Sequence, residues 1–463
     1  MEYIENKTFD EIKVGDSASL VRTLTMNDID LFALMSGDIN PARVRAQWFH
    51  RIIAHGMWDG SLISVSLISV LIGTKLPGPG TIYLSHTLGF KKPVIPGDTL
   101  TVTVTVTVKD EKTHLVKLDC QCVNQNGDIV ISGSAEVIAP TEKIKLPRVI
   151  LPEVHMHNHG ARYRQLIDLT KGLEPIRTAV VHPVDRNSLL GAIDAAEAKL
   201  IIPVLVGPDS KIRAVAEIEG IDLSSYELVT TKHSHEAAAR AVAMARASEV
   251  EALMKGSLHT DELMQEVVDK DTGLRTERRI SHVFVMDVPT YPRPLLITDA
   301  AINIYPDLED KRDIVQNAID LAIALGIENP RVAILSAVET VTPKIQSTLE
   351  AAALCKMADR KQITGGIVDG PLAFDNAISE EAARIKGIVS PVAGKADILV
   401  VPDLESGNML AKQLEYLAEA QSAGIVLGAR VPIALTSRAD NTLSRMASCA
   451  IALLLARKRR SKL

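Results

Sequence analysis

Residues 431–456 read V-P-I-A-L-T-S-R-A-D-N-T-L-S-R-M-A-S-C-A-I-A-L-L-L-A, and they decide how the second half of the chain is interpreted. The apolar run 431–435 predicts a short buried strand. Residues 436–445 are rich in hydroxyl groups and predict a loop, and the small apolar residues 446–456 predict a buried helix. Open parallel sheets bind ligands in loops at the carboxyl ends of their strands, so we expect a ligand site in this loop.

Ser444 and Arg445 stand where this loop enters the expected helix. A helix start presents free backbone N–H groups and the positive end of the helix dipole, and both favour anions. A guanidinium can bind a phosphoryl group through two parallel hydrogen bonds. The pair therefore predicts a phosphate-binding corner, with Arg438 and Asp440 in the same loop. The alternative is a solvated loop whose arginines pair with acids.

The composition is that of a multidomain globular protein. A length of 463 residues predicts two or three domains. The hydrophobic fraction is 46%, and the net charge of -6 gives no support for a nucleic-acid partner. The four cysteines lack zinc-ligand spacing, so we expect reduced thiols, no metal and a cytoplasmic location. We expect no membrane partner, because no apolar run reaches spanning length and the first residues do not resemble a signal peptide.

Residues 1–140 predict an α+β domain. A long apolar helix at 54–73 precedes several segments in which apolar and polar residues alternate, as in half-buried strands. The other expected elements are a helix at 25–35, strands at 100–108, 115–122 and 129–138, and a hairpin turn at Asn126-Gly127. This order predicts a sheet wrapped around the long helix.

Four motifs of this half resemble the MaoC-like, (R)-specific enoyl-CoA hydratases, which have the hot-dog fold. They are G-D-I-N-P (37–41), I-A-H-G-M (53–57), L-P-G-P-G-T-I-Y-L (76–84) and K-P-V-I-P-G-D-T-L (92–100). In the family motif Asp-x-Asn-Pro-x-His, the aspartate and the histidine act on the hydrating water and the α-proton. The resemblance implies a catalytic role for Asp38 and a substrate-binding role for Asn40, but Arg43 stands at the histidine position.

Arg43 changes the chemistry that this resemblance implies. An arginine stays protonated at any working pH and cannot take up a proton as a neutral imidazole does. We therefore expect hydratase activity to be lost or severely weakened, unless His50 or His55 substitutes. The domain could still hold acyl-CoA or build an oligomer, and Asp38 could be only a turn residue.

Residues 139–160 contain three prolines and no sustained periodicity, and they predict a linker at 141–159. Residues 160–463 then repeat a strand–loop–helix pattern, which predicts an α/β domain with a mostly parallel sheet, two subdomains and a cleft. The expected strands are 178–182, 202–206, 252–254, 283–287, 295–297, 332–335, 366–370 and 398–401, and the fourth and fifth are adjacent strands that a hairpin could join. The expected helices are 187–199, 234–248, 309–325, 344–358 and 409–420.

Two common nucleotide-binding motifs are missing from this half. No G-x-G-x-x-G follows a strand and no G-x-x-x-x-G-K-[ST] occurs, which disfavours a dehydrogenase and a P-loop kinase. Hydroxyl, amide, aspartate and glycine residues recur at the expected strand ends instead. That pattern suits an anionic ligand held by several loops.

Six motifs of this half resemble the phosphate acetyltransferase and phosphate butyryltransferase family. They are L-M-K-G-S-L-H-T (253–260), R-R-I-S-H-V (278–283), T-D-A-A-I-N-I-Y-P (298–306), D-G-P-L-A-F-D-N-A (369–377), A-D-I-L-V-V-P-D-L-E-S-G-N-M-L (396–410) and S-R-A-D-N-T-L-S-R (437–445). The resemblance implies the reaction acyl-CoA + phosphate ⇌ acyl phosphate + CoA, by direct transfer in a ternary complex. Coenzyme A and phosphate are then substrates, with no permanently bound cofactor. We also expect a homo-oligomer.

By position, Ser444 and Arg445 match the catalytic pair of this family. The resemblance implies that Ser444 donates to the oxyanion and that Arg445 holds phosphate or polarises the carbonyl. The residues expected to bind substrate in the cleft are Lys255, Asp299, Asn303, Asp369, Gly370, Ser406, Gly407, Asn408, Arg438 and Asp440.

The thiol base that the family reaction needs is not assigned. In the acetyl branch an aspartate proposed for this role follows the serine, and the matching position here is Ile451. Asp299, Asp369 and Asp440 are the candidates, and the departure favours a butyryl-type enzyme. Two other functions stay open: a non-catalytic acyl-CoA-sensing regulatory protein, and an (R)-specific enoyl-CoA hydratase whose C-terminal half is structural.

Overall fold

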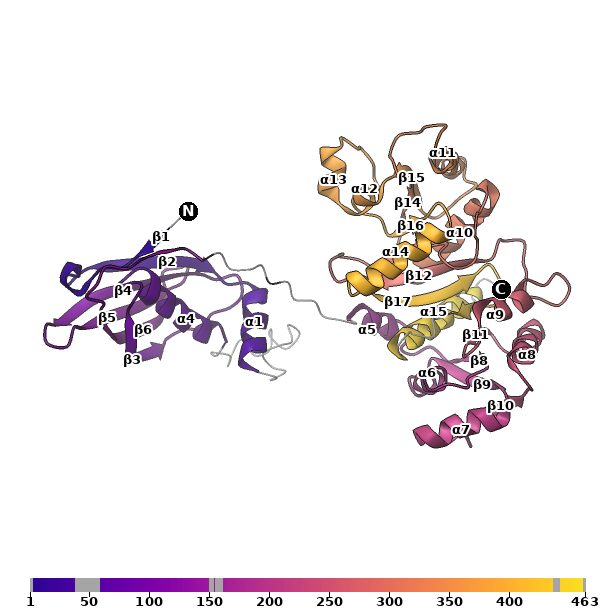
Figure 1. The fold of residues 1–463 in the computed structure, drawn as a ribbon, viewed down its shortest axis with the longest axis horizontal. Helices are drawn as coiled ribbons and strands as arrows, with labels where there is room; N and C mark the ends of the chain where they lie inside the picture. Colours follow the sequence, from indigo (N-terminus) through magenta and orange to yellow (C-terminus); the bar gives the residue numbers. More distant parts are fainter. Residues whose placement is uncertain (1–2, 38–58, 150–153, 155–160, 436–441, 461–463) are drawn as a thin grey trace. The chain divides into compact units, whose positions relative to one another are not determined.

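The structure is a computed structural model that describes residues 3–37, 59–149, 154, 161–435 and 442–460 (Figure 1). The chain divides into two compact units, residues 1–156 and 157–463. Within the described ranges, no helix has both the length and the apolar character needed to cross a membrane.

The first unit is a five-stranded antiparallel sheet with the order β2-β4-β5-β6-β3, packed against helix α4 (Asp59–Thr74). The remaining elements are β1 (Tyr3–Glu5), η1 (Phe9–Glu11), β2 (Ser17–Thr23), α1 (Met26–Ser36), β3 (Ile82–Phe90), β4 (Thr99–Asp110), β5 (Leu115–Val123), β6 (Ile129–Ile138) and β7 (Lys145–Pro147). The Thr-Val alternation of β4 puts Val102 and Val104 into the core, where they meet Ile68 and Leu71 of α4. The expected α+β hot-dog domain is confirmed.

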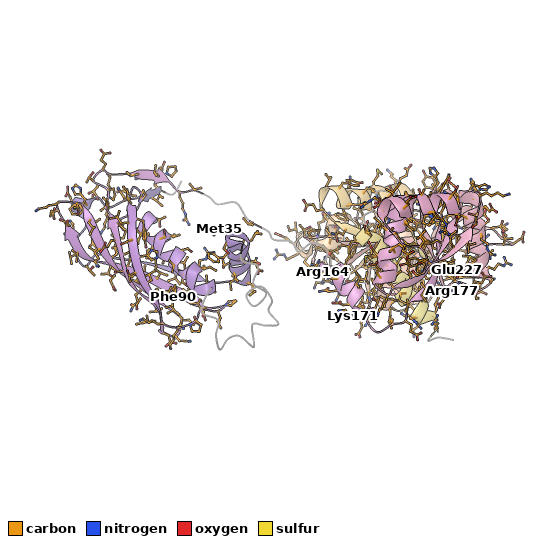
Figure 2. The ribbon with its side chains drawn as sticks, turned by 90° about the horizontal axis from the view of Figure 1, so that it is seen from below. Met35, Phe90, Arg164, Lys171, Arg177 and Glu227 are labelled. Carbon is orange, nitrogen blue, oxygen red and sulfur yellow. The ribbon has the colours of Figure 1, made fainter. Side chains whose placement is uncertain are left out.

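Two features of this unit differ from the sequence-based expectation. Strand β3 was not expected, because it pairs only with β6 at the edge of the sheet and none of its residues is fully buried. Phe90 at its end and Met35 on α1 are exposed apolar residues (Figure 2). Strand β7 lies inside the predicted linker and pairs with β1, so the first part of that segment belongs to the sheet structure of the first unit.

The second unit is built on an eleven-stranded mixed sheet with the order β10-β9-β8-β11-β18-β17-β12-β13-β16-β14-β15. Its strands are β8 (Ile176–Val181), β9 (Ile201–Gly207), β10 (Glu227–Thr230), β11 (Ala252–Lys255), β12 (Ser281–Asp287), β13 (Leu295–Thr298), β14 (Arg331–Leu335), β15 (Ile367–Leu372), β16 (Ile398–Val400), β17 (Gln421–Leu427) and β18 (Ile433–Ala434). Its helices are α5 (Ala161–Asp168), α6 (Arg186–Glu197), α7 (Asp209–Glu219), α8 (Ser234–Arg246), α9 (Thr260–Val268), α10 (Leu308–Ala324), α11 (Gln346–Asp359), α12 (Phe374–Ile378), α13 (Glu380–Ile385), α14 (Leu404–Leu417) and α15 (Thr442–Arg460).

The sheet consists of two parallel blocks that run in opposite directions. Strands β8 to β11 and β18 form one block, β13 to β16 form the other, and the antiparallel strands β12 and β17 join them. The chain therefore leaves β18 and β13 in opposite directions, but the pairings of Thr298 with Val283, Val283 with Ile425 and Ile425 with Ala434 place the last residues of the two strands at the same level of the sheet. Arg177 on β8 and Glu227 on β10 form an ion pair of 2.8 Å that spans β9 within the first block (Figure 2).

Helices cover both faces of this sheet. One continuous core packs α5, α6, α7, α10, α11 and α15 against one face. On the other face, α8 and α9 cover the first block, and α12, α13 and α14 cover the second, with a separate apolar cluster under each group. The two subdomains expected from the sequence correspond to these two blocks.

One strand pairing and the starts of two helices matter for the site. The expected hairpin of β12 and β13 is confirmed as an antiparallel pair. Helix α14 begins at Leu404, so Ser406, Gly407 and Asn408 lie in its first turns and not in the loop that we expected. Helix α15 begins by Thr442, so Ser444 and Arg445 are helical residues and the expected loop is shorter.

Candidate active site

The first turns of α15 hold the predicted catalytic pair below the surface. Ser444 is 6% exposed and Arg445 is 1% exposed. The buried hydroxyl of Ser448 donates to the carbonyl oxygen of Ser444 at 2.9 Å and accepts from the backbone N–H of Gly424 at 3.1 Å. Because Gly424 is in the middle of β17, this serine fixes the start of α15 to the sheet.

The stem of Arg445 runs against helix α6. A Cβ atom on Gly191 would lie 2.7 Å from Cδ of Arg445, so the helix approaches the arginine closely only because residue 191 has no side chain. Among the described residues, Arg445 has the largest side chain that is fully buried. Its position between α6 and the sheet is therefore fixed by packing.

Asp185, the N-cap of α6, interacts electrostatically with Arg445. Partial burial raises the pKa of Asp185, but the backbone N–H of Ser188, the hydroxyl of Ser257 and the charge of Arg445 together bring it below its ordinary value. The N–H of Ser188 donates to the Asp185 carboxylate at 2.8 Å. Asp185 is therefore ionised at neutral pH and balances the buried guanidinium.

The end of β11 brings Lys255 to the same edge of the sheet. Met254 pairs with Ala434 of β18, so the next residue, Lys255, lies at the end of β18 from which the chain leads to α15. Lys255 is 3% exposed. The N–H of Gly256 donates to the carbonyl of Val181 at 2.9 Å, and a Cβ at this glycine would lie 2.4 Å from that oxygen. Only glycine permits this turn, which also presents Ser257 to Asp185.

A second group of predicted residues surrounds Asp299, after β13. The Asp299 carboxylate accepts from the backbone N–H groups of Ala301 at 2.9 Å and Ile302 at 3.0 Å, and from the side-chain amide of Asn303 at 2.5 Å. Burial raises the pKa of Asp299, although these hydrogen bonds lower it. Both oxygens are thus engaged in shaping the loop, which argues for a structural role rather than that of the thiol base.

Contacts of Asn303 and α14 bring together the motifs 278–283, 298–306 and 396–410 in this second group. The Asn303 side chain accepts from Nε of Arg279 at 2.7 Å and donates to the Ile280 carbonyl at 2.9 Å. A Cβ on Gly407 would lie 2.9 Å from the carbonyl oxygen of Asp299, so α14 lies directly against this loop.

The first turns of α14 are fixed by their own polar contacts. The side chain of Asn408 donates to the Ala300 carbonyl at 3.2 Å. The hydroxyl of Ser406 donates to Asp403, the N-cap of the helix, at 2.8 Å. The contacts of Ser406 and Asn408 are therefore those of helix docking in this structure.

His282 lies between the two groups, on the face of the sheet that carries α9 and α14. The ring is fully buried, and Nε2 would lie 2.9 Å from a Cβ on Gly424. Burial lowers the pKa of His282 to about 3, although the backbone of Leu435 beside it raises the pKa. The His282 carbonyl accepts from the hydroxyl of Thr298 at 2.8 Å, and its backbone also contributes to the Asp299 site. This neutral histidine connects the end of β18 with the end of β13.

Asp369 and Gly370 are not on a strand next to β18, the strand that leads to α15 and Ser444. Both are on the edge strand β15, and five strands separate it from β18 in the strand order. Ile451 is fully buried in the core between α15 and the sheet, so the position of the family aspartate holds an apolar side chain. The predicted residues Asp38, Asn40, Arg438 and Asp440 lie outside the described part of the chain.

Four residues that shape the site were not predicted from the sequence: Asp185, Gly191, His282 and Ser448. Asp185 and Gly191 are far from α15 in the sequence, and no pattern links them to it. His282 stood inside a quoted motif, R-R-I-S-H-V, but its burial could not be read from one sequence. In the described residues, no cluster of His, Cys, Asp and Glu side chains could hold a metal ion.

Two family profiles match the chain. The profile described as "Phosphate acetyl/butaryl transferase" matches residues 232–453, and the profile "MaoC like domain" matches residues 12–123. A phosphate acetyltransferase of Rhizobium meliloti is 66% identical over 301 residues, which are 65% of this chain and 95% of that protein. The chain belongs to the phosphate acetyl/butyryl transferase family.

Further members and a solved structure agree with this membership. A phosphate butyryltransferase of Clostridium acetobutylicum is 42% identical over 294 residues, which are 64% of this chain and 98% of that protein. The crystal structure of a branched-chain phosphotransacylase from Enterococcus faecalis V583 superposes with a TM-score of 0.53 at 30% identity and covers 60% of this chain and 99% of that one. The chain is therefore a phosphate acyltransferase with an N-terminal MaoC-like domain, and coenzyme A and phosphate are its substrates.

Proposed function

We propose that this enzyme transfers an acetyl group between coenzyme A and phosphate. The 66% identity to a phosphate acetyltransferase, against 42% to a phosphate butyryltransferase, supports acetyl. Ile451, in place of the acetyl-branch aspartate, supports a larger short acyl group as the second candidate. The identity extends over 301 residues, whereas Ile451 is a single position, so we place acetyl first.

The proposed chemistry centres on the start of α15. A phosphate oxygen attacks the thioester carbonyl, a C–O bond forms, and the resulting tetrahedral oxyanion collapses as the C–S bond breaks. The thiolate of coenzyme A leaves with the electron pair and is protonated. Arg445 neutralises the phosphate, and the hydroxyl of Ser444 donates to the oxyanion.

The burial of these two side chains supports this assignment. In a poorly solvated site, fixed charges and donors stabilise developing charge more strongly than in water. The close approach of Gly191 fixes the stem of Arg445 before any substrate arrives, and the ionised Asp185 lies within reach of its charge. Phosphate is already ionised at neutral pH, so attack in this direction requires no protein base. The base for the reverse direction stays unassigned, with Asp440 as the remaining candidate.

We further propose that the MaoC-like domain has no hydratase activity, because Arg43 replaces the histidine of the family motif. The enzyme is proposed to be a cytoplasmic homo-oligomer. The four free cysteines, Cys120, Cys122, Cys355 and Cys449, agree with a reducing compartment.

A panel of acyl-CoA substrates tests this proposal. Each acyl-CoA is incubated with phosphate, and release of the coenzyme A thiol is followed. We expect the highest kcat/KM with acetyl-CoA, lower values with propionyl-CoA and butyryl-CoA, and no loss of crotonyl-CoA absorbance with water alone. A higher kcat/KM with butyryl-CoA would select the second candidate, and phosphate-independent turnover of crotonyl-CoA would contradict the inactive hydratase domain.

A further inference from the structure

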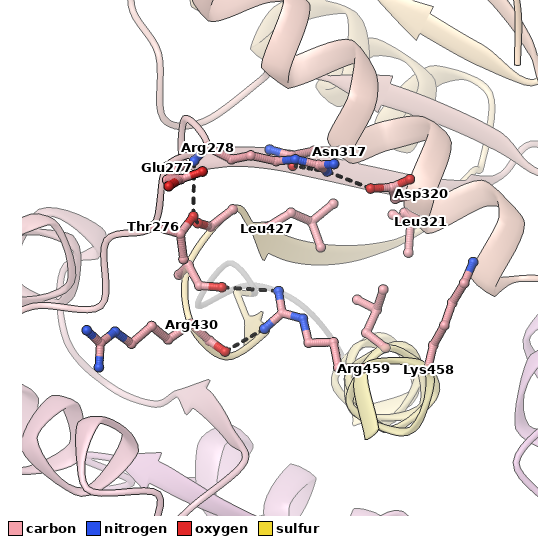
Figure 3. Close-up of a pocket in the computed structure, with 13 residues that line it drawn as sticks. Thr276, Glu277, Arg278, Asn317, Asp320, Leu321, Leu427, Arg430, Lys458 and Arg459 are labelled. Atoms are coloured by element: carbon pink, nitrogen blue, oxygen red, sulfur yellow. Dashed lines mark hydrogen bonds and ion pairs between the residues drawn. The ribbon is translucent and has the colours of Figure 1, made fainter. Parts of the chain in front are cut away.

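A pocket of about 650 Å³ opens at the far end of α15, away from Ser444 and Arg445 (Figure 3). Its walls come from the segment before β12, from α10, from the end of β17 and from the last turns of α15. Ser444 and Lys458 are separated by about 20 Å along the helix axis, at about 1.5 Å per residue. The pocket is therefore separate from the proposed acyl-transfer site.

The charged lining of the pocket is mostly basic. Arg278, Arg430, Lys458 and Arg459 contribute positive charge, and Glu277 and Asp320 contribute negative charge. Arg278 pairs with Asp320, and both side chains are close to half exposed. The pairing leaves an excess of positive charge around the hollow, although the whole chain carries a net charge of -6.

Arg459 is held rigidly on one wall. Its guanidinium donates to the backbone carbonyl oxygens of Arg430 at 2.6 Å and Ala429 at 3.1 Å, and neither bond neutralises its charge (Figure 3). Burial and the charge of Arg278 lower the pKa of Arg459. Two arginines therefore face one hollow and repel each other, which an anion between them would relieve.

The floor of the pocket is apolar. Leu321, Leu427 and Leu455 line it. An inorganic ion would leave this surface unfilled, whereas an organic portion of a ligand would cover it. A volume of this size falls in the range of small-molecule sites, which are typically about 300–1,000 Å³.

We propose that this pocket binds a small organic anion that carries at least two negative charges on an apolar or ring-containing body. The charged groups of the ligand lie between Arg278, Lys458 and Arg459, and its body covers the leucine floor. Phosphate groups and carboxylate groups both satisfy this chemistry, so a nucleoside diphosphate and a polycarboxylate are the two sources to distinguish.

Calorimetric titration of the full-length enzyme tests the proposal with three probes: ADP, citrate and inorganic pyrophosphate. We expect saturable binding of ADP or citrate and weaker binding of pyrophosphate, which has no organic body. Binding of ADP alone identifies phosphate groups as the preferred charge, and binding of citrate alone identifies carboxylates. The absence of saturable binding for all three probes overturns the proposal.

Variants locate the binding. The double substitution Arg278→Gln with Lys458→Gln should weaken binding by at least about tenfold, the scale of losing charged hydrogen bonds. Arg460→Gln removes a cation from the same helix end outside the pocket lining and should bind like the wild type. Unchanged binding in the double variant contradicts the proposal.

A single variant keeps the test valid if the double variant fails to fold. Lys458→Glu reverses the charge of one partly exposed side chain at the pocket wall and should still weaken the binding of the organic anion. Equal binding in Lys458→Glu and wild type would contradict the proposal. The acyl-CoA panel is independent of this result, so failure of the pocket leaves the proposed transfer reaction intact.

Discussion

Arg445 shows how a buried cation can be kept in place without exposure to solvent. Its stem packs on Gly191, and Asp185 supplies the balancing charge from the N-cap of α6. The motif around Ser444 and Arg445 could be found in the sequence because its residues are contiguous. Asp185 and Gly191 could not be found in this way, since only the folded chain brings α6 against α15.

Gly191→Ala should expose the tight fit between α6 and Arg445. Alanine normally stabilises a helix interior relative to glycine by roughly 0.5–1 kcal/mol. Here the new Cβ would lie 2.7 Å from Cδ of Arg445, and overpacking costs about 1–3 kcal/mol. We therefore expect a net loss of about 1 kcal/mol in the free energy of unfolding, measured in urea, together with lower acyl transfer.

The control is to make Gly191→Ala in a protein that already carries Arg445→Ala. Once the arginine stem is gone, alanine at position 191 should no longer destabilise the protein. A double-mutant cycle measures the difference. If Gly191→Ala costs the same with and without Arg445, the close contact is not what limits this position.

His282 should make stability depend on pH. Its folded-state pKa is lowered to about 3 from an ordinary value of 6.5. The stability that it contributes is complete above about pH 6.5 and declines as the pH falls toward the folded pKa, because only the unfolded chain takes up the proton. Between about pH 6.5 and 5.5, we expect this residue to lower the free energy of unfolding by about 1 kcal/mol.

Urea unfolding at several pH values measures this effect as a slope. His282→Gln should flatten the slope in this window, even if the variant is less stable at every pH. Equal slopes in the wild type and the variant would show that His282 is not the titrating group.

At the scale of elements, strongly patterned segments could be predicted and crowded junctions could not. The alternation in β4 and the hairpin of β12 and β13 were predicted because each depends on local pattern. Strand β17 was missed, since its small apolar residues follow directly on α14 and no turn signal separates them. The early start of α14 was missed because Asp403 caps a helix whose first turns are polar and glycine-containing.

Ser448→Ala should loosen the docking of α15 on β17. The substitution leaves the backbone N–H of Gly424 without its acceptor, and an unsatisfied buried donor costs about 1–3 kcal/mol. The first turn of α15 then shifts, and we expect turnover to fall by about tenfold or more. Urea unfolding and the thiol-release assay measure the two effects.

Ser188→Ala is the matched control for stability. Ser188 is also a fully buried helical serine, but its hydroxyl donates to Asp185 at the start of its own helix and accepts from no strand N–H in the hydrogen bonds of the described residues. Its loss leaves no backbone N–H unpaired, so the effect on unfolding should be smaller than for Ser448→Ala. Equal losses for both variants would argue against the role of Ser448 in docking.

At the scale of the whole molecule, the chain combines two units with separate cores. The relative from Rhizobium meliloti is matched over 95% of its length by 65% of this chain. The family profile for acyl transfer lies entirely in the second unit. The sequence could predict this organisation because each half carries its own set of contiguous motifs.

A fragment of residues 157–463 should therefore fold and transfer acyl groups with a turnover close to that of the full chain. Circular dichroism and the thiol-release assay check folding and activity. The fragment 1–156 should fold without acyl-transfer activity. If the fragment 157–463 folds but is inactive, the MaoC-like domain contributes to the reaction.

Our central proposal is that acyl transfer takes place at the start of α15. Arg445→Ala in the full-length enzyme tests it most directly. Initial rates of coenzyme A release from acetyl-CoA and phosphate should fall by at least about 100-fold, the scale of losing a group that stabilises the transition state. The melting temperature of the variant, measured in parallel, shows whether the protein is still folded. A folded variant with unchanged turnover would contradict the placement of the reaction at this arginine.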